Sequence, residues 1–429
     1  METADKNLYK PRLIDSTIDE YLTVAKALCV EGPKWCGKTW TSSFHAGSEF
    51  LVGDPGNNFA NRKLAEMDPV FILNGPSPRL IDEWQEVPAI WDAVRMTVDR
   101  SHNKGQFILT GSSTPMRKGV MHSGTGRIVK LRMHTMSLFE SGDSDGKVSL
   151  RDICNDSFTT PLLTGEVSLE HLAYLTVRGG WPDNIGVDVN NAGLLPKSYI
   201  DSVIYEDIQR LDEAVKYDIH KLELLFRSLA RNESTTVSHS KLSDDISEID
   251  NGKLSDDTIS KYMSSLGRLF LFENQQPYGP GLRSSLRVKQ NEKRHFCDPA
   301  VACAALNITP GKLVNNPDTF GFMFEAMVER DLRVYATAFG GKLFHYQDYK
   351  NNEIDAVIED GDGEWCAIEI KLGANKIDEA AEKLIKIKKD ISEAGGKAPK
   401  SLCVICGLSN AAYKRPDGVY VVPLTSLKD

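Results

Sequence analysis

The spacing of apolar residues predicts that the chain begins with strands that alternate with helices. Short apolar runs of strand length occur at residues 25–31, 79–83 and 106–109, and residues 38–44 can form a helix without any breaker. Strands that alternate with helices indicate a parallel α/β sheet. In such a sheet the ligand site is expected at the carboxyl ends of the strands.

The middle of the chain is predicted to be helical. Residues 169–211 follow a helical pattern that is interrupted by a turn at 178–182. Residues 218–277 read as helix, polar turn, helix, acidic loop and helix, an order that suits a winged helix-turn-helix whose second helix can enter a major groove. Because acidic side chains oppose the basic ones along this stretch, a packing or oligomerisation module is an equally good interpretation.

Composition indicates a globular protein with several domains. The chain has 429 residues, of which 41% are hydrophobic and 26% charged. It has no apolar run near the roughly 18 residues of a membrane span and no signal peptide, so we expect a cytoplasmic protein without a membrane partner and with reduced cysteines. Cys403 and Cys406 have CxxC spacing, but their apolar run favours a buried strand over zinc or redox chemistry. The net charge of −9 argues against an extended nucleic-acid surface but not against a local basic groove.

The first candidate chemistry lies at residues 32–39, which satisfy the phosphate-binding pattern G-x-x-x-x-G-K-[ST] in full. The two glycines let the backbone wrap a polyphosphate, Lys38 can reach the β- and γ-phosphates, and the Thr39 hydroxyl can ligate Mg²⁺. The predicted strand before the loop and helix after it favour a nucleoside triphosphate site over a Gly/Pro loop that binds nothing. The residues predicted to bind the nucleotide are Gly32, Pro33, Lys34, Trp35, Cys36, Gly37, Lys38, Thr39 and Trp40.

Polar residues that suit nucleotide hydrolysis follow the next predicted strands. One apolar run ends in Asp82 and Glu83, which can hold the Mg²⁺ hydration shell and orient or deprotonate a water. Thr110 follows the next run and can sense the γ-phosphate or the attacking water, with a Gly/Ser turn of satisfied hydroxyls as the alternative. Arg127 could act in trans as an arginine finger, which would require a homo-oligomer, or could be an ordinary surface residue.

The C-terminal part of the chain carries a second group of candidate residues. Residues 352–359 and 365–371 predict two strands joined by a tight turn. Alternation with a period of two places Asp355 on one face of the first strand, and Glu369 with Lys371 on one face of the second. If these faces coincide, two carboxylates and an ammonium converge, which suits Mg²⁺ and attack on a phosphodiester. A solvated Glu/Lys pair on an exposed strand is the alternative.

The order of these motifs resembles that of a known family over nearly the whole chain. It is similar to uncharacterised archaeal and bacterial AAA+ ATPases in which a C-terminal domain of unknown function, with a nuclease-like fold, follows the ATPase. The resemblance implies ATP and Mg²⁺ as cofactors, Asp82 with Glu83 as the Walker B pair, Thr110 at the sensor 1 position, and Arg127 as the arginine after a small-residue turn. The segments that carry the resemblance are 11–15, 31–39, 80–85, 107–113, 126–127 and 134–140.

The spacing of the C-terminal carboxylates and lysine resembles that of the PD-(D/E)xK nuclease superfamily. This resemblance implies that Asp355 and Glu369 hold a metal ion and that Lys371 helps to activate water. Glu325, near the start of a predicted amphipathic helix, matches the accessory acidic position and is a further predicted metal ligand. Such a fold can persist as a binding platform after its chemistry is lost.

These interpretations together predict an α/β multidomain protein. We expect an AAA+ P-loop ATPase domain with a parallel sheet over residues 1–160, a helical lid over 165–215, a winged helix over 216–285, and a restriction-endonuclease-like α/β domain over 286–429. The polar residues 141–164 are predicted to be a linker or insertion. The expected function is ATP hydrolysis coupled to a nuclease-like domain that acts on DNA. The alternatives are an ATP-gated DNA- or protein-binding module with an inactive nuclease fold, and a nucleotide switch with negligible turnover.

Overall fold

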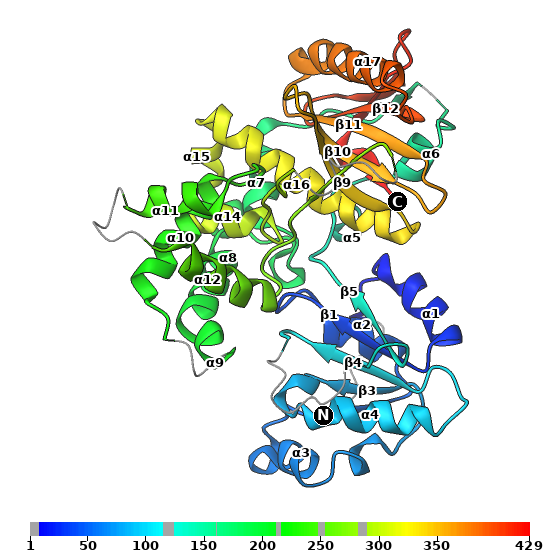
Figure 1. Cartoon of the computed structure of the whole chain (residues 1–429), viewed down its shortest axis with the longest axis vertical. Coiled ribbons are helices and arrows are strands. Elements are labelled where there is room, and N and C mark those ends of the chain that lie inside the picture. Colours follow the sequence, from blue (N-terminus) through cyan, green and yellow to red (C-terminus); the bar gives the residue numbers. More distant parts are fainter. Residues whose placement is uncertain (1–7, 115–123, 160, 212–215, 248–253, 282–289) are drawn as a thin grey trace. The chain divides into compact units, whose positions relative to one another are not determined.

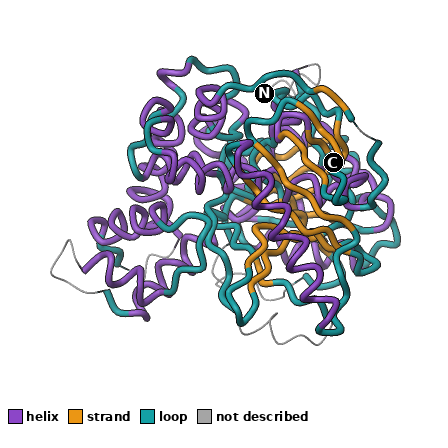
Figure 2. The backbone as a smooth tube through the Cα atoms, turned by 90° about the horizontal axis from the view of Figure 1, so that it is seen from above, coloured by secondary structure: helices purple, strands orange, loops and turns teal. Residues whose placement is uncertain are grey.

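The computed structural model contains two compact units, each built from several segments of the chain. Figure 1 labels their helices and strands, and Figure 2 colours the backbone by secondary structure. The residues that it describes are 8–114, 124–159, 161–211, 216–247, 254–281 and 290–429. The first unit comprises Met1–Thr135, Asp207–Lys216 and Ser264–Leu271. The second unit comprises Met136–Glu206, Tyr217–Met263 and Phe272–Asp429.

The first unit contains a five-stranded sheet in the order β2-β3-β4-β1-β5. Its strands are β1 (Ala27–Glu31), β2 (Ser48–Leu51), β3 (Arg79–Asp82), β4 (Phe107–Gly111) and β5 (Ile128–Arg132). Its helices are α1 (Ile14–Val24), α2 (Lys38–His45), α3 (Gly56–Met67), α4 (Ala89–Asp99) and α9 (Ile208–Leu211). All neighbouring strands are parallel, which confirms the predicted parallel α/β sheet.

The central strands are continuous apolar runs, and their alternate residues point to opposite sides of the sheet. Both faces of the sheet are therefore apolar. Helix α4 packs on the face that carries Cys29 and Leu109, and α1 packs on the face that carries Leu28 and Ile108. Strand β4 lies between β1 and β3. The carboxyl ends of these three strands therefore meet at one edge, where α2 begins.

The second unit contains an eight-stranded mixed sheet in the order β7-β13-β14-β12-β11-β10-β9-β8. Its strands are β7 (Leu162–Leu163), β8 (Gln276–Pro277), β9 (Lys342–Gln347), β10 (Glu353–Glu359), β11 (Trp365–Lys371), β12 (Ser401–Cys406), β13 (Ala411–Lys414) and β14 (Tyr420–Pro423). Strands β10 and β11 are antiparallel, as the sequence predicts. Helix α17 (Ile377–Glu393) connects the parallel strands β11 and β12, and packs Leu384 and Ile387 on the sheet. Cys403 and Cys406 are buried in β12, which confirms the predicted buried strand.

Residues 141–164 are not a simple linker. They contain β6 (Val148–Ser149), α6 (Leu150–Cys154) and β7. Strand β6 pairs with the C-terminal strand β15 (Leu427–Lys428), and β7 pairs with β13. A strand of two residues is too short to show a periodic pattern of apolar residues. The prediction of a linker therefore relied on the polar composition of residues 141–164. As a result, residues 136–160 cluster with the second unit, although the predicted first domain includes them.

The other helices of the second unit form its helical part. They are α5 (Leu138–Ser141), α7 (Leu169–Arg178), α8 (Leu194–Ser202), α10 (Ile219–Arg231), α11 (His239–Ser247), α12 (Asp256–Arg268), α14 (Pro299–Ala305), α15 (Pro310–Val314) and α16 (Pro317–Ala338). The last turn of α12 clusters with the first unit, and so does the segment Asp207–Lys216, so the predicted winged helix and the predicted lid are each divided between the two units. A role of this region in reading DNA stays a prediction. No helix in the described part of the chain is both long and apolar enough to cross a membrane.

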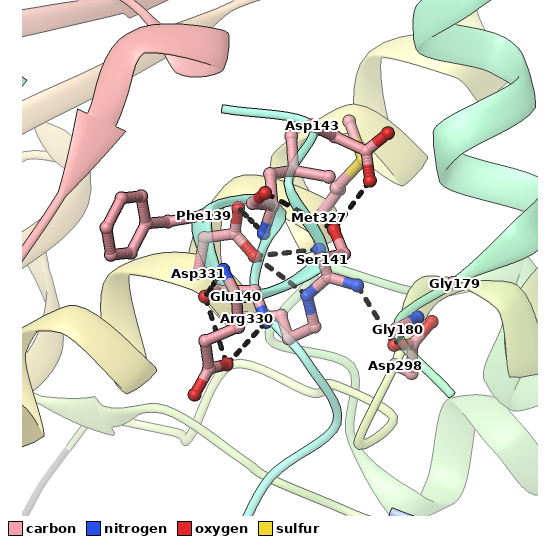
Figure 3. Close-up of polar contacts among 12 residues, drawn as sticks. Phe139, Glu140, Ser141, Asp143, Gly179, Gly180, Asp298, Met327, Arg330 and Asp331 are labelled. Carbon is pink, nitrogen blue, oxygen red and sulfur yellow. Dashed lines mark hydrogen bonds and ion pairs between the residues drawn. The ribbon is translucent and has the colours of Figure 1, made fainter. Parts of the chain in front are cut away.

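A buried ion-pair cluster joins distant segments within the second unit (Figure 3). Arg330 in α16 bonds Asp298 at 3.1 Å and Asp331 at 2.7 Å, and both carboxylates are fully buried. The backbone N–H of Gly180 donates to Asp298 at 2.9 Å, and that of Leu138 donates to Asp331 at 3.1 Å. The cluster thus fixes the segment after the first sheet, the 178–182 turn and the start of α14 on one helix.

Candidate functional site

The predicted phosphate loop connects β1 to α2 at the carboxyl edge of the first sheet. A Cβ atom at Gly32 would lie 2.2 Å from the carbonyl oxygen of Met133, so only glycine fits there. Gly37 has a φ of 105°, in the left-handed region that favours glycine. Both glycines of the pattern are therefore required by the backbone of this loop.

The loop is held in shape by polar contacts from inside the first unit. The Lys38 side chain is buried, with 4% of the residue exposed, and its Nζ donates to the carbonyl oxygen of Pro33 at 2.9 Å. Arg12 donates to the carbonyl oxygen of Cys36 at 2.8 Å. Lys34 bonds Asp207 at 2.5 Å. No sequence pattern pointed to Asp207, which lies 173 residues from Lys34 along the chain.

The side chains of three predicted site residues converge next to the loop. The hydroxyl of Thr39 donates to Oδ1 of Asp82 at 2.8 Å, and the hydroxyl of Thr110 donates to the same oxygen at 2.7 Å. Burial raises the pKa of Asp82, and the hydrogen bonds from Thr110 and Thr39 oppose this rise. The arrangement places a hydroxyl oxygen and a carboxylate oxygen side by side at the start of α2. Oxygen atoms of this kind are the ligands that Mg²⁺ prefers.

Glu83 is held by residues at the end of β4. Its backbone N–H donates to the Thr110 hydroxyl at 3.0 Å, and its carboxylate accepts a hydrogen bond from Ser112 at 2.8 Å. Gln85 donates to both Glu83 and Ser112. Glu83 has a φ of 56°, which turns the chain sharply after β3. Gln85 and Ser112 were not among the predicted site residues, although both lie within the motifs that predicted Glu83 and Thr110.

The remaining predicted residues of the first unit lie farther from this cluster or on its surface. Trp35 and Trp40 are 47% and 46% exposed. Arg127 pairs with Asp99 at 2.8 Å and precedes β5, whereas the phosphate loop follows the carboxyl end of the parallel strand β1. Arg127 therefore lies at the opposite edge of its own sheet. A finger role would require a second copy of the chain, and both that role and the homo-oligomer stay predictions.

In the second unit, the structure brings together the predicted residues of β10 and β11. The ammonium of Lys371 bonds Asp355 at 2.9 Å and Glu369 at 2.8 Å. The backbone N–H of Ile370 also donates to Asp355, at 2.8 Å. Lys383, which projects from α17, bonds the other oxygen of Glu369 at 2.7 Å. Lys383 was not predicted, because nothing in the sequence places α17 beside the end of β11.

Burial and neighbouring charges set the protonation of this group. Burial would raise the pKa of Asp355, but the ammonium groups of Lys371, Lys293 and Lys383 outweigh it and hold this pKa at about 2. Burial and the Asp355 charge raise the pKa of Glu369. Burial would lower the pKa of Lys371, but the two carboxylates raise it above its usual range. The lysine therefore stays charged between its two partners at neutral pH.

Glu325, the third predicted metal ligand of this part, has a lysine partner. Lys293 approaches Glu325 to 2.5 Å, Glu329 to 3.6 Å and Glu353 to 3.7 Å. Lys293 was missed because it precedes α14 in a polar stretch that shows no strand pattern. Within the described residues, no group of three or more His, Cys, Asp and Glu side chains is arranged to hold a metal ion.

Three family models match successive parts of the chain. Residues 24–141 match an AAA domain, residues 169–312 match a domain of unknown function (DUF8612), and residues 320–427 match another domain of unknown function (DUF4143). No curated protein matches the chain. Among solved structures, the Walker-type ATPase PABY2304 of Pyrococcus abyssi is similar over 71% of this chain and 97% of its own, with 12% identity and a TM-score of 0.40.

The match to the AAA domain covers the phosphate loop, Asp82, Glu83 and Thr110. The first part of the chain is therefore an ATPase-like AAA domain. The match to the C-terminal domain of unknown function covers Glu325, Asp355, Glu369 and Lys371 but assigns no activity to them. The nuclease-like assignment of that part stays a prediction.

Proposed function

We propose that the first unit binds and hydrolyses ATP at the carboxyl edge of its parallel sheet. The observation that carries the proposal is the pair of hydrogen bonds from Thr39 and Thr110 to one oxygen of Asp82, next to a complete phosphate loop. This arrangement joins the loop, the acidic strand end and the strand between them in one polar network. Bringing these polar side chains together is costly unless they are paired, and a phosphate site accounts for their convergence.

Each residue of the network has a role in the proposed reaction. The backbone N–H groups of the loop and Lys38 bind the phosphates, and Thr39 with Asp82 would hold Mg²⁺, whose charge stabilises the phosphate oxygens. Glu83 orients the attacking water and accepts its proton. Ser112 and Gln85 bond the Glu83 carboxylate and fix its direction. Thr110 donates to the Asp82 carboxylate and accepts a hydrogen bond from the backbone N–H of Glu83.

Two variants test the nucleotide site. In Lys38→Ala the loop loses its buried ammonium, so we expect nucleotide affinity to fall at least tenfold. In Glu83→Gln the shape is kept but the base is lost, so we expect ATP to bind as in the wild type and turnover to fall roughly a hundredfold. Binding of a fluorescent ATP analogue and phosphate release measure the two effects, with Glu86→Gln, three residues away, as the control. Unchanged binding and turnover in both variants would remove the proposal.

We further propose that the C-terminal part of the chain binds nucleic acid and cuts it with a divalent cation. The proposal rests on the convergence of Asp355, Glu369 and Lys371 at the end of two antiparallel strands. The carboxylates would hold the cation. Lys371 would then move away from them and position a water or the phosphodiester. An ATP-gated binding module with an inactive nuclease fold is the alternative, because Lys371 already bonds both carboxylates.

A cleavage assay separates these two functions. The full chain is incubated with linear and single-stranded DNA, with and without Mg²⁺ or Mn²⁺ and ATP. We expect metal-dependent cleavage that falls at least a hundredfold in Asp355→Asn and Glu369→Gln, while Glu359→Gln, at the far end of β10, cuts as the wild type does. DNA binding without cleavage under all conditions would support the binding module instead.

A further inference from the structure

We propose that Lys293 is a built-in cation of the C-terminal site, so that its ammonium takes the place of a divalent ion beside Glu325. The inference concerns the same cluster as the proposed nuclease function. It rests on the proposed nuclease function only where it calls the cluster a metal site, because the contacts of Lys293 do not depend on cleavage. It assigns Glu325 to a lysine and not to a metal ion.

The contacts of Lys293 are those of a central ion surrounded by oxygens. Its side chain is 2% exposed, and three carboxylates surround its Nζ: Glu325 at 2.5 Å, Glu329 at 3.6 Å and Glu353 at 3.7 Å. A buried ammonium is costly unless it is paired, and this one has three partners from two different elements, α16 and β10. Without Lys293, these carboxylates would lose the ammonium that lies among them.

The charges of the wider cluster support the same role. Lys371 and Lys383 bond Asp355 and Glu369, while Lys293 contacts the other three carboxylates. Lys293 also lowers the pKa of Asp355, which connects the two halves of the cluster. Burial raises the pKa of Glu325 and of Glu329, although Lys293 opposes the rise. Each half of the cluster therefore contains at least one ammonium.

The backbone fixes Lys293 at this place. Residue 293 pairs with Gln275 in an antiparallel bridge, with N–H to carbonyl distances of 2.9 and 3.0 Å in the two directions. Two residues later, His295 bonds Glu233 at 3.0 Å and also contacts Glu329. Lys293 lies within the stretch 169–312, outside the stretch 320–427 that contains the other site residues. The C-terminal site is therefore completed by a segment from the helical middle of the chain.

A consequence is that Glu325 is not available as a metal ligand while Lys293 is in place. The ammonium of Lys293 contacts the Glu325 carboxylate and occupies the position beside it that a divalent ion would need. The predicted metal ligand Glu325 therefore acts as a positioning residue for Lys293.

The test is to remove the ammonium and count bound ions. Nucleotide-free protein is titrated with Mn²⁺, free Mn²⁺ is followed by electron paramagnetic resonance, and the melting temperature is recorded with and without the ion. Lys293→Met keeps most of the side-chain volume, and we expect it to bind one Mn²⁺ more than the wild type and to be stabilised by the ion. Lys389→Met, whose side chain is 73% exposed, is the matched control and should behave as the wild type.

Every outcome decides the proposal. If Lys293→Met folds and binds no additional ion, the ammonium does not occupy a cation position and the proposal is overturned. If Lys293→Met does not fold, Lys293→Gln is tested in the same way. If neither variant folds at any Mn²⁺ concentration, the ion cannot replace the ammonium, which also overturns the proposal. Wild-type protein that neither binds Mn²⁺ nor cuts DNA would remove the nuclease function, while an ion gained in Lys293→Met would still support this inference.

Discussion

The hydroxyl of Thr110 shows how one side chain can connect the two acidic positions of the nucleotide site. It donates to Asp82 at 2.7 Å and accepts the backbone N–H of Glu83 at 3.0 Å, and the residue is fully buried. Both acceptor and donor capacities of the hydroxyl are therefore used. An apolar group of the same shape would leave a carboxylate and an N–H without these partners.

This geometry predicts different results for two substitutions at residue 110. Thr110→Val keeps the shape but leaves buried polar groups unpaired, each at a cost of about 1–3 kcal/mol. If Glu83 then loses its direction, ATP turnover should fall roughly ten- to a hundredfold, while nucleotide affinity changes by no more than about threefold. Thr110→Ser keeps the hydroxyl and serves as the control, with near wild-type turnover. Equal losses in both variants, measured as steady-state phosphate release, would contradict a role for the hydroxyl.

At the scale of elements, continuous sequence patterns predicted the structure well and contacts between distant segments were not predictable. Strand β11 was predicted with its observed bounds, because its alternation is regular and a tight turn precedes it. The short strands β6 and β7 were missed, since their partners are C-terminal strands that no local pattern reveals. Local signals specify backbone conformation, whereas pairing depends on the whole fold.

The same distinction holds for the candidate sites. Lys38, Thr39, Asp82 and Thr110 were all predictable. Asp82 and Thr110 lie at the carboxyl ends of two parallel strands, and Lys38 and Thr39 belong to the motif that follows a third. Lys293 was not predictable, because its partners belong to α16 and β10, which are separated from it along the chain. Its charge is also common in surface positions, so the sequence gives no reason to single it out.

At the scale of the whole molecule, the two compact units imply two cooperative transitions on heating. The proposed ATP site lies in the first unit and the buried cluster around Arg330 lies in the second. A ligand that binds the native first unit stabilises it by about 2.7 kcal/mol at a concentration of 100 times its Kd. We therefore expect a non-hydrolysable ATP analogue with Mg²⁺ to raise one transition by roughly 5–10 °C and to leave the other within about 1 °C.

Removing the charge at Arg330 should affect the other transition. Arg330→Met leaves the carboxylates of Asp298 and Asp331 buried without the guanidinium group that bonds them, and breaking a buried ion pair costs about 3–5 kcal/mol. The transition that the nucleotide does not move should therefore fall by roughly 5–15 °C in a calorimetric scan. Arg227→Met, an exposed residue of α10 in the same unit, is the matched control and should change neither transition by more than about 1 °C. A single transition that both the nucleotide and Arg330→Met displace would show that the units unfold together, because a shared cooperative unit transmits each perturbation to the whole chain.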